Sequence, residues 1–270
     1  MLRLISDKKQ TLKEFTENNY AQASFFWNAL LKNKDIKVNG VKVGKDVPLQ
    51  NGDEVCYYLT KKQEEKPAFY TVFEDENVLI IDKESGVNSE AVYAALAREK
   101  ECYFIHRLDR NTRGVMAFAL NEKTANALMQ AFKEKRVEKI YHALCFGAFK
   151  REEEVLQGYL RKDEKNALVK VFDRPTNGAE KIITEYKVLE RYPDTTKIAV
   201  VLHTGKTHQI RAHFAHIGHP LVGDMKYGNP ERNKALKTAR QCLIAKSLRF
   251  DLQGEWAYLC EKIFVSQFEV

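Results

Sequence analysis

A charged segment divides this chain into a short part and a long part. Residues 60–70, TKKQEEKPAFY, are almost free of large aliphatic side chains and contain Pro67, as is typical of a connection between folded units. The whole chain has 270 residues, which exceeds the usual size of one domain. We therefore expect a small domain over residues 1–60, a linker over 61–70 and a larger domain over 71–270.

The short part predicts a compact α+β module. Its first half is an amphipathic helical stretch with apolar residues at Leu12, Phe15, Phe25, Phe26, Leu30 and Leu31. In its second half, DIKVNGVKVGKDVPLQNGDEVCYYL, the apolar residues alternate, and Asn39-Gly40 suits a two-residue turn. This pattern is typical of a β-hairpin.

The long part also predicts an α+β fold, without internal repeats. Strand-like patterns cover residues 73–86, 115–120, 140–147, both sides of the Pro193-Asp194 turn, 243–251 and 255–268. Helix-like patterns cover 91–100, the stretch after Asn121, the stretch after Thr207, and 231–240. Residues 150–178 are polar and have no clear assignment.

Two of these helices have recognisable ends. Asn121 is placed to cap the first, and an apolar stripe on one of its faces predicts core packing; the stripe consists of Ala125, Leu128, Met129 and Phe132. Thr207 is placed to cap the second helix, and Gly218 to end it.

The loop HRLDRNTRG, residues 106–114, places one carboxylate among three guanidinium groups. Asp109 lies between Arg107, Arg110 and Arg113, on a loop between two predicted strands. A structural ion pair, in which the arginines keep the aspartate ionised, is the common outcome of such a composition. A carboxylate on a loop is also what a covalent nucleophile or a proton acceptor requires, so both interpretations stay open.

Five histidines crowd one region, at positions 203, 208, 213, 216 and 219. Their spacing raises a zinc hypothesis, but HExxH is absent and no cysteine joins them. We favour hydrogen bonding, packing or RNA contact, and we expect no metal. The signatures GxSxG, GxxxxGK[ST] and GxGxxG are also absent, so the most recognisable hydrolase and nucleotide-binding classes have no support.

Charge and apolar patterning indicate a partner and a location. The net charge is +7, which suits a polyanion such as RNA, although a merely soluble basic protein has a similar balance. No apolar run approaches the roughly 20 residues that span a bilayer. The five cysteines are scattered and odd in number, which argues against a disulfide framework. We expect a cytoplasmic protein without membrane association.

Three segments, which include the loop around Asp109 and most of the clustered histidines, resemble the motifs of a known enzyme family. HRLDRNTRGVMAFAL, KIYHALCFG and TGKTHQIRAHFAHIGHPLVGDMKYG are similar, in this order, to the three motifs of the RluA family of RNA pseudouridine synthases. The resemblance covers about residues 70–265, and residues 10–60 resemble the S4-like RNA-binding domain that often precedes this catalytic domain. It implies a mixed, largely antiparallel central sheet with flanking helices, after a small α+β domain.

The resemblance also implies an activity and three catalytic residues. The family converts uridine to pseudouridine within RNA without a cofactor, and structured ribosomal RNA is a more natural target here than transfer RNA. By matching position, Asp109 is the essential aspartate, which attacks carbon 1′ of the ribose or assists glycal formation. Tyr141 stacks on the flipped base and serves the final proton abstraction, and Arg211 pairs with Asp109.

Further contacts with RNA are expected around these three residues. The candidates are His106, Arg107, Arg110, Lys206, His208 and Leu243, of which Leu243 walls the base pocket and His106 fixes the loop by hydrogen bonding. The partner is ribosomal or transfer RNA, no obligate protein partner is implied, and a monomer is the family expectation. The alternative function is a non-catalytic protein that binds RNA or assists its folding on a synthase-like scaffold.

Overall fold

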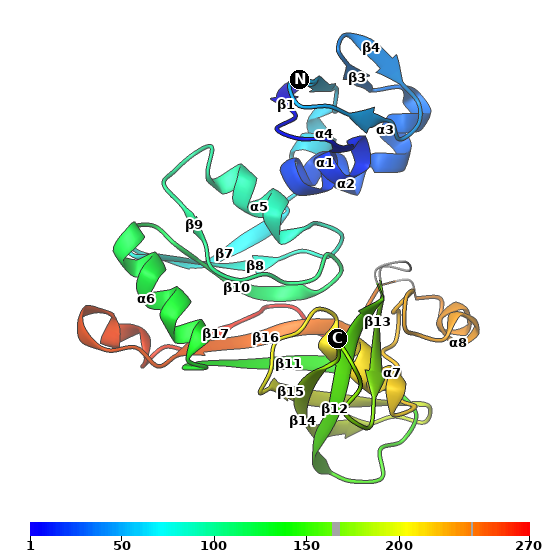
Figure 1. The fold of residues 1–270 in the computed structure, drawn as a ribbon, viewed down its shortest axis with the longest axis vertical. Helices are drawn as coiled ribbons and strands as arrows, with labels where there is room; N and C mark the ends of the chain where they lie inside the picture. Colours follow the sequence, from blue (N-terminus) through cyan, green and yellow to red (C-terminus); the bar gives the residue numbers. More distant parts are fainter. Residues whose placement is uncertain (164–167, 239) are drawn as a thin grey trace.

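The computed structural model describes residues 1–163, 168–238 and 240–270. Its first part is a four-stranded antiparallel sheet covered by three short helices (Figure 1). The strands, in spatial order, are β1 (Leu2–Ile5), β6 (Glu54–Tyr57), β3 (Ile36–Val38) and β4 (Val41–Val43). The helices are α1 (Leu12–Asn19), α2 (Ala21–Phe25) and α3 (Trp27–Asn33), and β2 (Gln10–Thr11) pairs with β5 (Pro48–Leu49). This module is consistent with an S4-like domain.

The expected hairpin of this module is confirmed, but its helical stretch is broken. Asn39 and Gly40 both have positive φ, at 48° and 78°, as a two-residue turn between β3 and β4 requires. Tyr20 is extended, with φ −143° and ψ 97°, so α1 ends there and α2 begins in a new direction. The apolar spacing identified the helices but not the break.

The predicted linker contains one short helix, α4 (Lys61–Glu64). Thr60 accepts a hydrogen bond from the backbone of Gln63, whose side chain in turn accepts one from the backbone of Thr60. This capping box stabilises a helix that has no buried side chain of its own.

The long part is built on one eleven-stranded sheet, counted over the described residues. Its main path, in spatial order, is β13 (Leu168–Phe172), β12 (Glu153–Asp163), β14 (Glu180–Arg191), β15 (Thr195–Leu202), β11 (Val137–Phe146), β16 (Leu243–Phe250), β10 (Arg113–Ala119), β8 (Val78–Lys83) and β7 (Phe69–Glu74). In addition, β9 (Tyr103–Phe104) pairs with β10 and β17 (Phe264–Val265) pairs with β16. Only β10 and β16 run parallel among the described pairs, so the predicted mixed, largely antiparallel sheet is confirmed.

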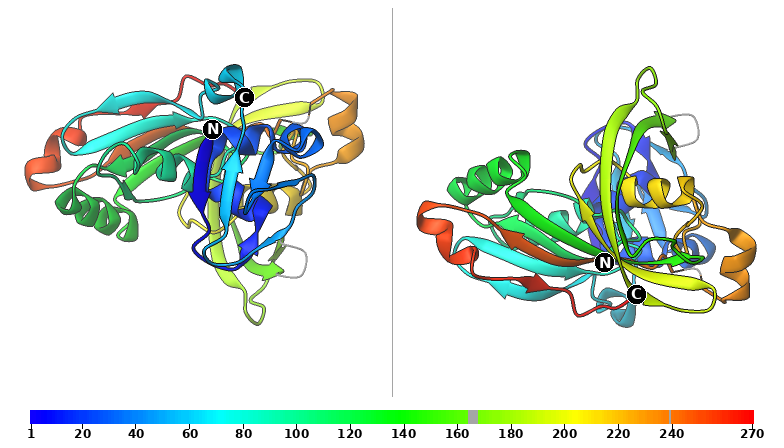
Figure 2. Two further views of the ribbon diagram at one scale, coloured as in Figure 1. Left: turned by 90° about the horizontal axis from the view of Figure 1, so that it is seen from above. Right: turned by 90° about the horizontal axis from the view of Figure 1, so that it is seen from below.

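Helices flank this sheet at both ends (Figure 2). They are α5 (Ser89–Leu96), α6 (Glu122–Lys133), α7 (Gln209–His216), α8 (Pro230–Ala235) and the 3-10 helix η2 (Gly254–Leu259). Asn121 caps α6 by accepting a hydrogen bond from the backbone of Thr124, at 2.8 Å, as predicted. No helix of the described residues is long and apolar enough to cross a membrane.

Several local predictions are wrong. Met129 is 45% exposed because it lies beside the buried face of α6 rather than on it. Residues 150–178, which had no assignment, contain β12 and β13, whose alternate side chains face solvent; positions 164–167 of this stretch lie outside the described residues. Residues 255–268 form η2 and the short β17 rather than long strands, and α8 is shorter than the helix expected over 231–240.

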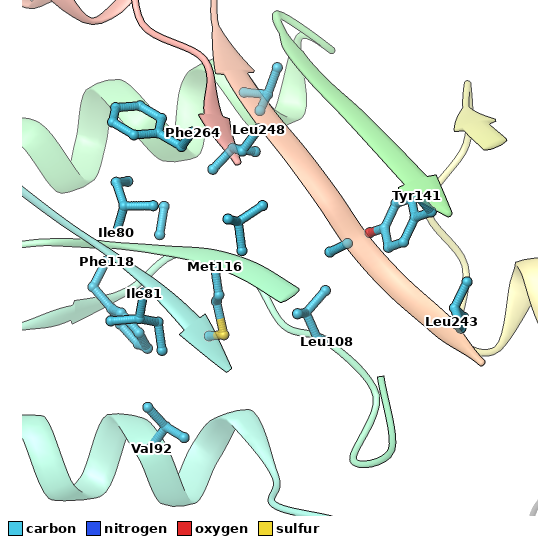
Figure 3. Close-up of a cluster of buried hydrophobic side chains, with 14 of the residues drawn as sticks. Ile80, Ile81, Val92, Leu108, Met116, Phe118, Tyr141, Leu243, Leu248 and Phe264 are labelled. Carbon is cyan, nitrogen blue, oxygen red and sulfur yellow. The ribbon is translucent and has the colours of Figure 1, made fainter. Parts of the chain in front are cut away.

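The main core lies between the sheet and its helices, and it extends to Leu108, the residue before Asp109 in the chain (Figure 3). Buried residues of β8 and β10 form its centre, among them Ile80, Ile81, Met116 and Phe118. Leu108, Tyr141 and Leu243 belong to the same cluster and lie at its edge in Figure 3. These three positions are therefore held by packing that the rest of the domain provides.

The first module packs against α5 of the long part (Figure 1). Ala21 is buried in the main core, and the Phe25 ring contacts it. The side chain of Arg98 donates to the Asn19 carbonyl at 2.8 Å, and Asn88 donates to Asn18 at 3.0 Å. These contacts join the end of α1 and α2 to the domain that carries the candidate site.

Candidate active site

A cavity of about 930 Å³ opens between the loop before β10, the strands β11 and β16, and the segment that leads into α7. It is lined by eight of the nine predicted site residues, namely His106, Arg107, Asp109, Tyr141, Lys206, His208, Arg211 and Leu243. The exception is Arg110. The cavity therefore brings together residues that lie more than 100 positions apart in the chain.

The loop that carries Asp109 is held in place by hydrogen bonds from buried polar side chains. Lys83 is fully buried, and its Nζ donates to the carbonyls of Glu84, Val87 and Arg110, at 2.8, 2.9 and 3.2 Å. Burial lowers the pKa of Lys83 to about 7, and the charge of Asp109 opposes this shift. Ser89 holds both backbone polar groups of Leu108 at 3.0 Å.

Gly114 sets the exit of this loop. It has φ +117°, and a Cβ atom there would lie 2.2 Å from the carbonyl oxygen of Ala245 on β16. A side chain would therefore prevent the close approach of β10 and β16 that ends the loop.

Arg211 joins Asp109 to a second carboxylate. Its Nη1 donates to Oδ2 of Asp109 at 3.1 Å, while Nε and Nη2 donate to the two oxygens of Asp224 at 2.7 and 3.0 Å. The side chain of Asp224 is fully buried, and that of Arg211 is 6% exposed. Such a two-point pair fixes the plane of the guanidinium group.

Charge and burial act in opposite directions on this pair. Burial alone would raise the pKa of Asp224, but the hydrogen bonds and the charge of Arg211 outweigh it, so the pKa lies below its usual value. Burial would likewise lower the pKa of Arg211, but Asp224 and Asp109 raise it. Arg211 is therefore a permanent cation that faces the cavity from an anchored position.

The loop arginines do not surround Asp109, contrary to expectation. Each of them pairs with a glutamate instead, and the guanidinium group that bonds to Asp109 is that of Arg211 on α7. The partners are Glu90 for Arg107, Glu17 for Arg110 and Glu84 for Arg113. Arg110 thus reaches α1 of the first module and lies outside the cavity. Arg113 is almost buried, with its guanidinium 3.5 Å from the centre of the Phe268 ring.

Tyr141 and Leu243 form an apolar wall of the cavity. Their exposed fractions are 9% and 3%, and they come from neighbouring strands, β11 and β16. Burial, assisted by the negative charge of Asp109, raises the pKa of Tyr141, so its side chain is a neutral phenol. A flat neutral ring beside an apolar side chain suits the stacking of a nucleobase.

His208 lies next to Asp109 rather than on the outer surface. Its Nε2 is 3.8 Å from Oδ2 of Asp109, and its Nδ1 is hydrogen-bonded to Tyr227 at 2.9 Å. Burial lowers its pKa, and Asp109 opposes this shift. His208, with φ 55°, is also the N-cap residue of α7, so the prediction of Thr207 as the helix cap is wrong. Lys206, at the rim, pairs with Glu180.

His106 fixes the loop from its other end. Its Nε2 accepts a hydrogen bond from the backbone of Ala117 at 3.0 Å, and its ring stacks on Phe132 with 4.6 Å between the centres. Burial, together with the nearby charge of Lys139, lowers the pKa of His106 to about 3. It is therefore neutral at physiological pH and cannot attract a phosphate by charge.

The five clustered histidines each have a separate partner. His203, His208, His213, His216 and His219 contact Glu185, Tyr227, Thr184, Asp173 and the Phe146 carbonyl respectively. Among the described residues, no three histidine, cysteine or acidic side chains form a group that could hold a metal ion.

Sequence reasoning missed Asp224, Tyr227 and Lys83. Asp224 and Tyr227 lie in the segment GDMKYG of the third motif, where a lone carboxylate beside a turn glycine was the available signal. Lys83 lies in IIDKESG, where a lysine directly after a buried strand could have indicated an internal cation. Their roles depend on contacts across the fold, which local patterns do not contain.

Comparisons with known proteins agree with this geometry. Residues 65–216 match the family described as RNA pseudouridylate synthase. The chain is 30% identical, over 226 residues, to ribosomal large subunit pseudouridine synthase C of Vibrio cholerae, with 74% of this chain and 70% of that protein covered. It is also 30% identical to ribosomal large subunit pseudouridine synthase D of Buchnera aphidicola, with 82% of this chain and 74% of that protein covered.

A solved structure shares the fold. Human RNA pseudouridylate synthase domain containing 1 superposes with a TM-score of 0.60 at 26% identity, over 68% of this chain and 79% of that one. The family match includes Asp109, Tyr141 and Arg211 and extends over more than half of the chain. This chain therefore belongs to the RNA pseudouridine synthases of the RluA family, which are isomerases.

Proposed function

We propose that this protein isomerises specific uridines of ribosomal RNA to pseudouridine, with Asp109 as the essential carboxylate. The observation that carries this proposal is the position of Asp109: it lines the cavity and accepts a hydrogen bond from Arg211, which Asp224 anchors. An oriented carboxylate in a cavity is what a nucleophile or a proton acceptor at the ribose needs.

The reaction exchanges one bond of the base for another. The bond between ribose carbon 1′ and nitrogen 1 of uracil breaks, the base rotates, and carbon 1′ bonds to carbon 5. The proton on carbon 5 leaves and nitrogen 1 gains one, so no cofactor is required. Asp109 either attacks carbon 1′ or removes a ribose proton to give a glycal, and both routes need the same oriented carboxylate.

Tyr141 and Leu243 hold the base in this proposal. A nucleotide must leave its stack to reach Asp109, which costs a few kcal/mol, and contact with an aromatic ring offsets part of that cost. The raised pKa of Tyr141 supports stacking, because a neutral phenol is a poor base. The proton on carbon 5 of the base is then removed either by a water molecule or by Tyr141, and Tyr141 can act as this base only if it gives up its own proton during the reaction.

Two of the proposed phosphate contacts have an exposed charge at the cavity rim. Arg107 and Lys206 both line the cavity and form exposed ion pairs with glutamates. A phosphate of the RNA could replace the glutamate as the partner of either side chain. Arg110 points to α1 instead, so we assign it to the support of the loop. His106 is a neutral group that positions the loop, and His208, whose pKa burial lowers, lies beside the carboxylate.

Ribosomal RNA is supported by the relatives. Two proteins about 30% identical to this chain are named as ribosomal large subunit pseudouridine synthases. A cytoplasmic location, a monomeric state, RNA binding by the first module and its boundary near residue 60 stay predictions.

The test is pseudouridine mapping on total RNA from cells with and without this protein. A site that disappears with the protein, returns with the intact chain and does not return with Asp109→Asn would establish the activity and identify the uridine. Asp173→Asn is the matched control, because Asp173 is an exposed aspartate outside the cavity. If the Asp109→Asn protein binds RNA and restores the site, the carboxylate is dispensable and the proposal fails.

A further inference from the structure

The cavity extends well beyond the residues that surround Asp109. Its other end lies where α6 runs into β11 and where β16 ends. Eight Lys or Arg side chains and three carboxylates line the whole cavity. The cavity lining as a whole therefore favours a polyanion.

The positive charges at the two ends differ in their partners. Near Asp109, the cations are neutralised: Arg211 by Asp109 and Asp224, and Lys206 by Glu180. At the far end, four cations make no ion pair among the described residues. These are Lys133, Lys135, Lys139 and Arg249. The far end therefore has charge available for a ligand.

Lys139 is the most constrained of the four. It is partly buried, its Nζ lies 5.3 Å from the centre of the Phe132 ring, and no carboxylate of the described residues pairs with it. Burial holds the pKa of Lys139 below its ordinary value, since no counter-charge compensates for the lost hydration. A partly buried ammonium that faces a cavity without an anionic partner costs stability, and an anion in that cavity would recover it.

Lys139 also has a defined relation to the proposed base platform. It lies two residues before Tyr141 on β11, and residues at this spacing share one face of a strand, about 6.6 Å apart. Both side chains line the same cavity. A nucleotide stacked on Tyr141 therefore has its strand within reach of Lys139.

We propose that the ammonium group of Lys139 binds a backbone phosphate of the RNA strand, next to the nucleotide that lies at Asp109. Lys133, Lys135 and Arg249 continue this contact along the same strand. The assignment rests on the proposed function for the identity of the RNA, but the contact itself is a matter of binding and not of turnover.

The experiment compares Lys139→Met with the wild type and with Lys187→Met. Methionine keeps the apolar stem of the side chain and removes its charge, and Lys187 is an exposed lysine on β14, outside the cavity. Binding to a transcript of the large-subunit ribosomal RNA of the same organism is measured across a salt titration. Pseudouridine formation and thermal unfolding are measured on the same samples.

We expect Lys139→Met to weaken binding about tenfold and to reduce the slope of log K against log salt by about 0.7–0.9, the contribution of one phosphate. At saturating RNA its turnover stays within about threefold of the wild type. Its unfolding midpoint is unchanged or higher, because an unpaired charge is removed from a partly buried position. Lys139→Arg and Lys187→Met both keep the slope of the wild type, the first because it keeps the charge and the second because it lies outside the cavity.

An unchanged affinity and slope in Lys139→Met would overturn the inference. So would a variant that binds normally and loses turnover, because Lys139 would then act on the reaction itself. If the wild type forms no pseudouridine while Lys139→Met shows the altered slope, the proposed function fails and the phosphate contact stands.

Discussion

Replacement of Asp224 by asparagine tests whether the second carboxylate controls the first one. Asp224 does not line the cavity, so an effect on turnover must pass through the groups that Asp224 holds, of which Arg211 bonds directly to Asp109. Its Oδ1 accepts bonds from Nη2 of Arg211 and from the backbones of Lys226 and Tyr227, at 3.0, 2.8 and 3.1 Å. Among the described residues, its Oδ2 accepts only the bond from Nε of Arg211, at 2.7 Å.

The magnitude follows from these contacts. An asparagine oxygen in the Oδ1 position keeps three bonds, and its amide nitrogen then faces Nε of Arg211 as donor against donor. One charge-assisted hydrogen bond is lost, at about 1.5–3 kcal/mol, and the buried guanidinium keeps only Asp109 as counter-charge. With this imbalance included, Asp224→Asn should cost about 3 kcal/mol of unfolding free energy and lower the midpoint by about 5–10 °C.

The catalytic effect should exceed the effect on RNA binding. Relief of the donor conflict rotates the guanidinium group and displaces the carboxylate that it holds. A shift of about 1 Å at a reacting group costs on the order of 100-fold in rate, so kcat should fall by about this factor while KM changes little. The assay is single-turnover pseudouridine formation at 25 °C, where the variant stays folded, beside RNA binding and thermal unfolding.

Asp173→Asn is the matched control for this experiment. Asp173 also pairs with a residue of α7, His216, but it lies at the surface, so its replacement should leave kcat and the midpoint nearly unchanged. If Asp224→Asn keeps kcat within threefold of the wild type, the inference that Asp224 positions Asp109 through Arg211 is wrong.

Three further predictions concern the frame of the site. The pKa of His106 is depressed from 6.5 to about 3, so the unfolded state binds an additional proton between these values and stability falls as the pH falls through that window. His106→Gln, which keeps an acceptor for Ala117, should remove about 2 kcal/mol of the stability difference between pH 7.5 and pH 5 in urea titrations; an undiminished difference would assign it to other groups. Gly114→Ala should cost at least about 3 kcal/mol in the same assay because of the clash with β16, whereas Gly205→Ala, with open space around it, should cost less than about 1 kcal/mol. Glu17→Ala should lower stability by about 1 kcal/mol and should do so only while Arg110 is present, which a double-mutant cycle measures; additive effects would show that the pair contributes nothing.

The sequence predicted the position of Asp109 well because the signal is local. An apolar run before residue 106 and another after Gly114 must be strands, so the polar residues between them form a loop. The cap of α6 and the turn between β14 and β15 were predicted for the same reason. Each depends on residues that lie within a few positions of one another.

The partners of Asp109 could not be predicted from composition. Three arginines of one loop pair with three different glutamates, while the guanidinium that reaches the carboxylate lies 102 positions after Asp109. A side chain finds its partner through the fold, and neighbours in a loop point in different directions. The resemblance to the family indicated Arg211, but Asp224 became visible only as the second half of the same ion pair.

The position of β16 has a consequence for how the protein is made. This strand lies between β11 and β10 in the centre of the sheet, yet it is formed by residues 243–250. A ribosome adds about 5–20 residues per second, so roughly 5–20 s pass between the synthesis of Asp109 and that of Arg211. During that time the two halves of the sheet have no strand to join them and the carboxylate has no guanidinium partner. The nascent chain can therefore fold its first module early, but it becomes an enzyme only after its central strand has left the ribosome.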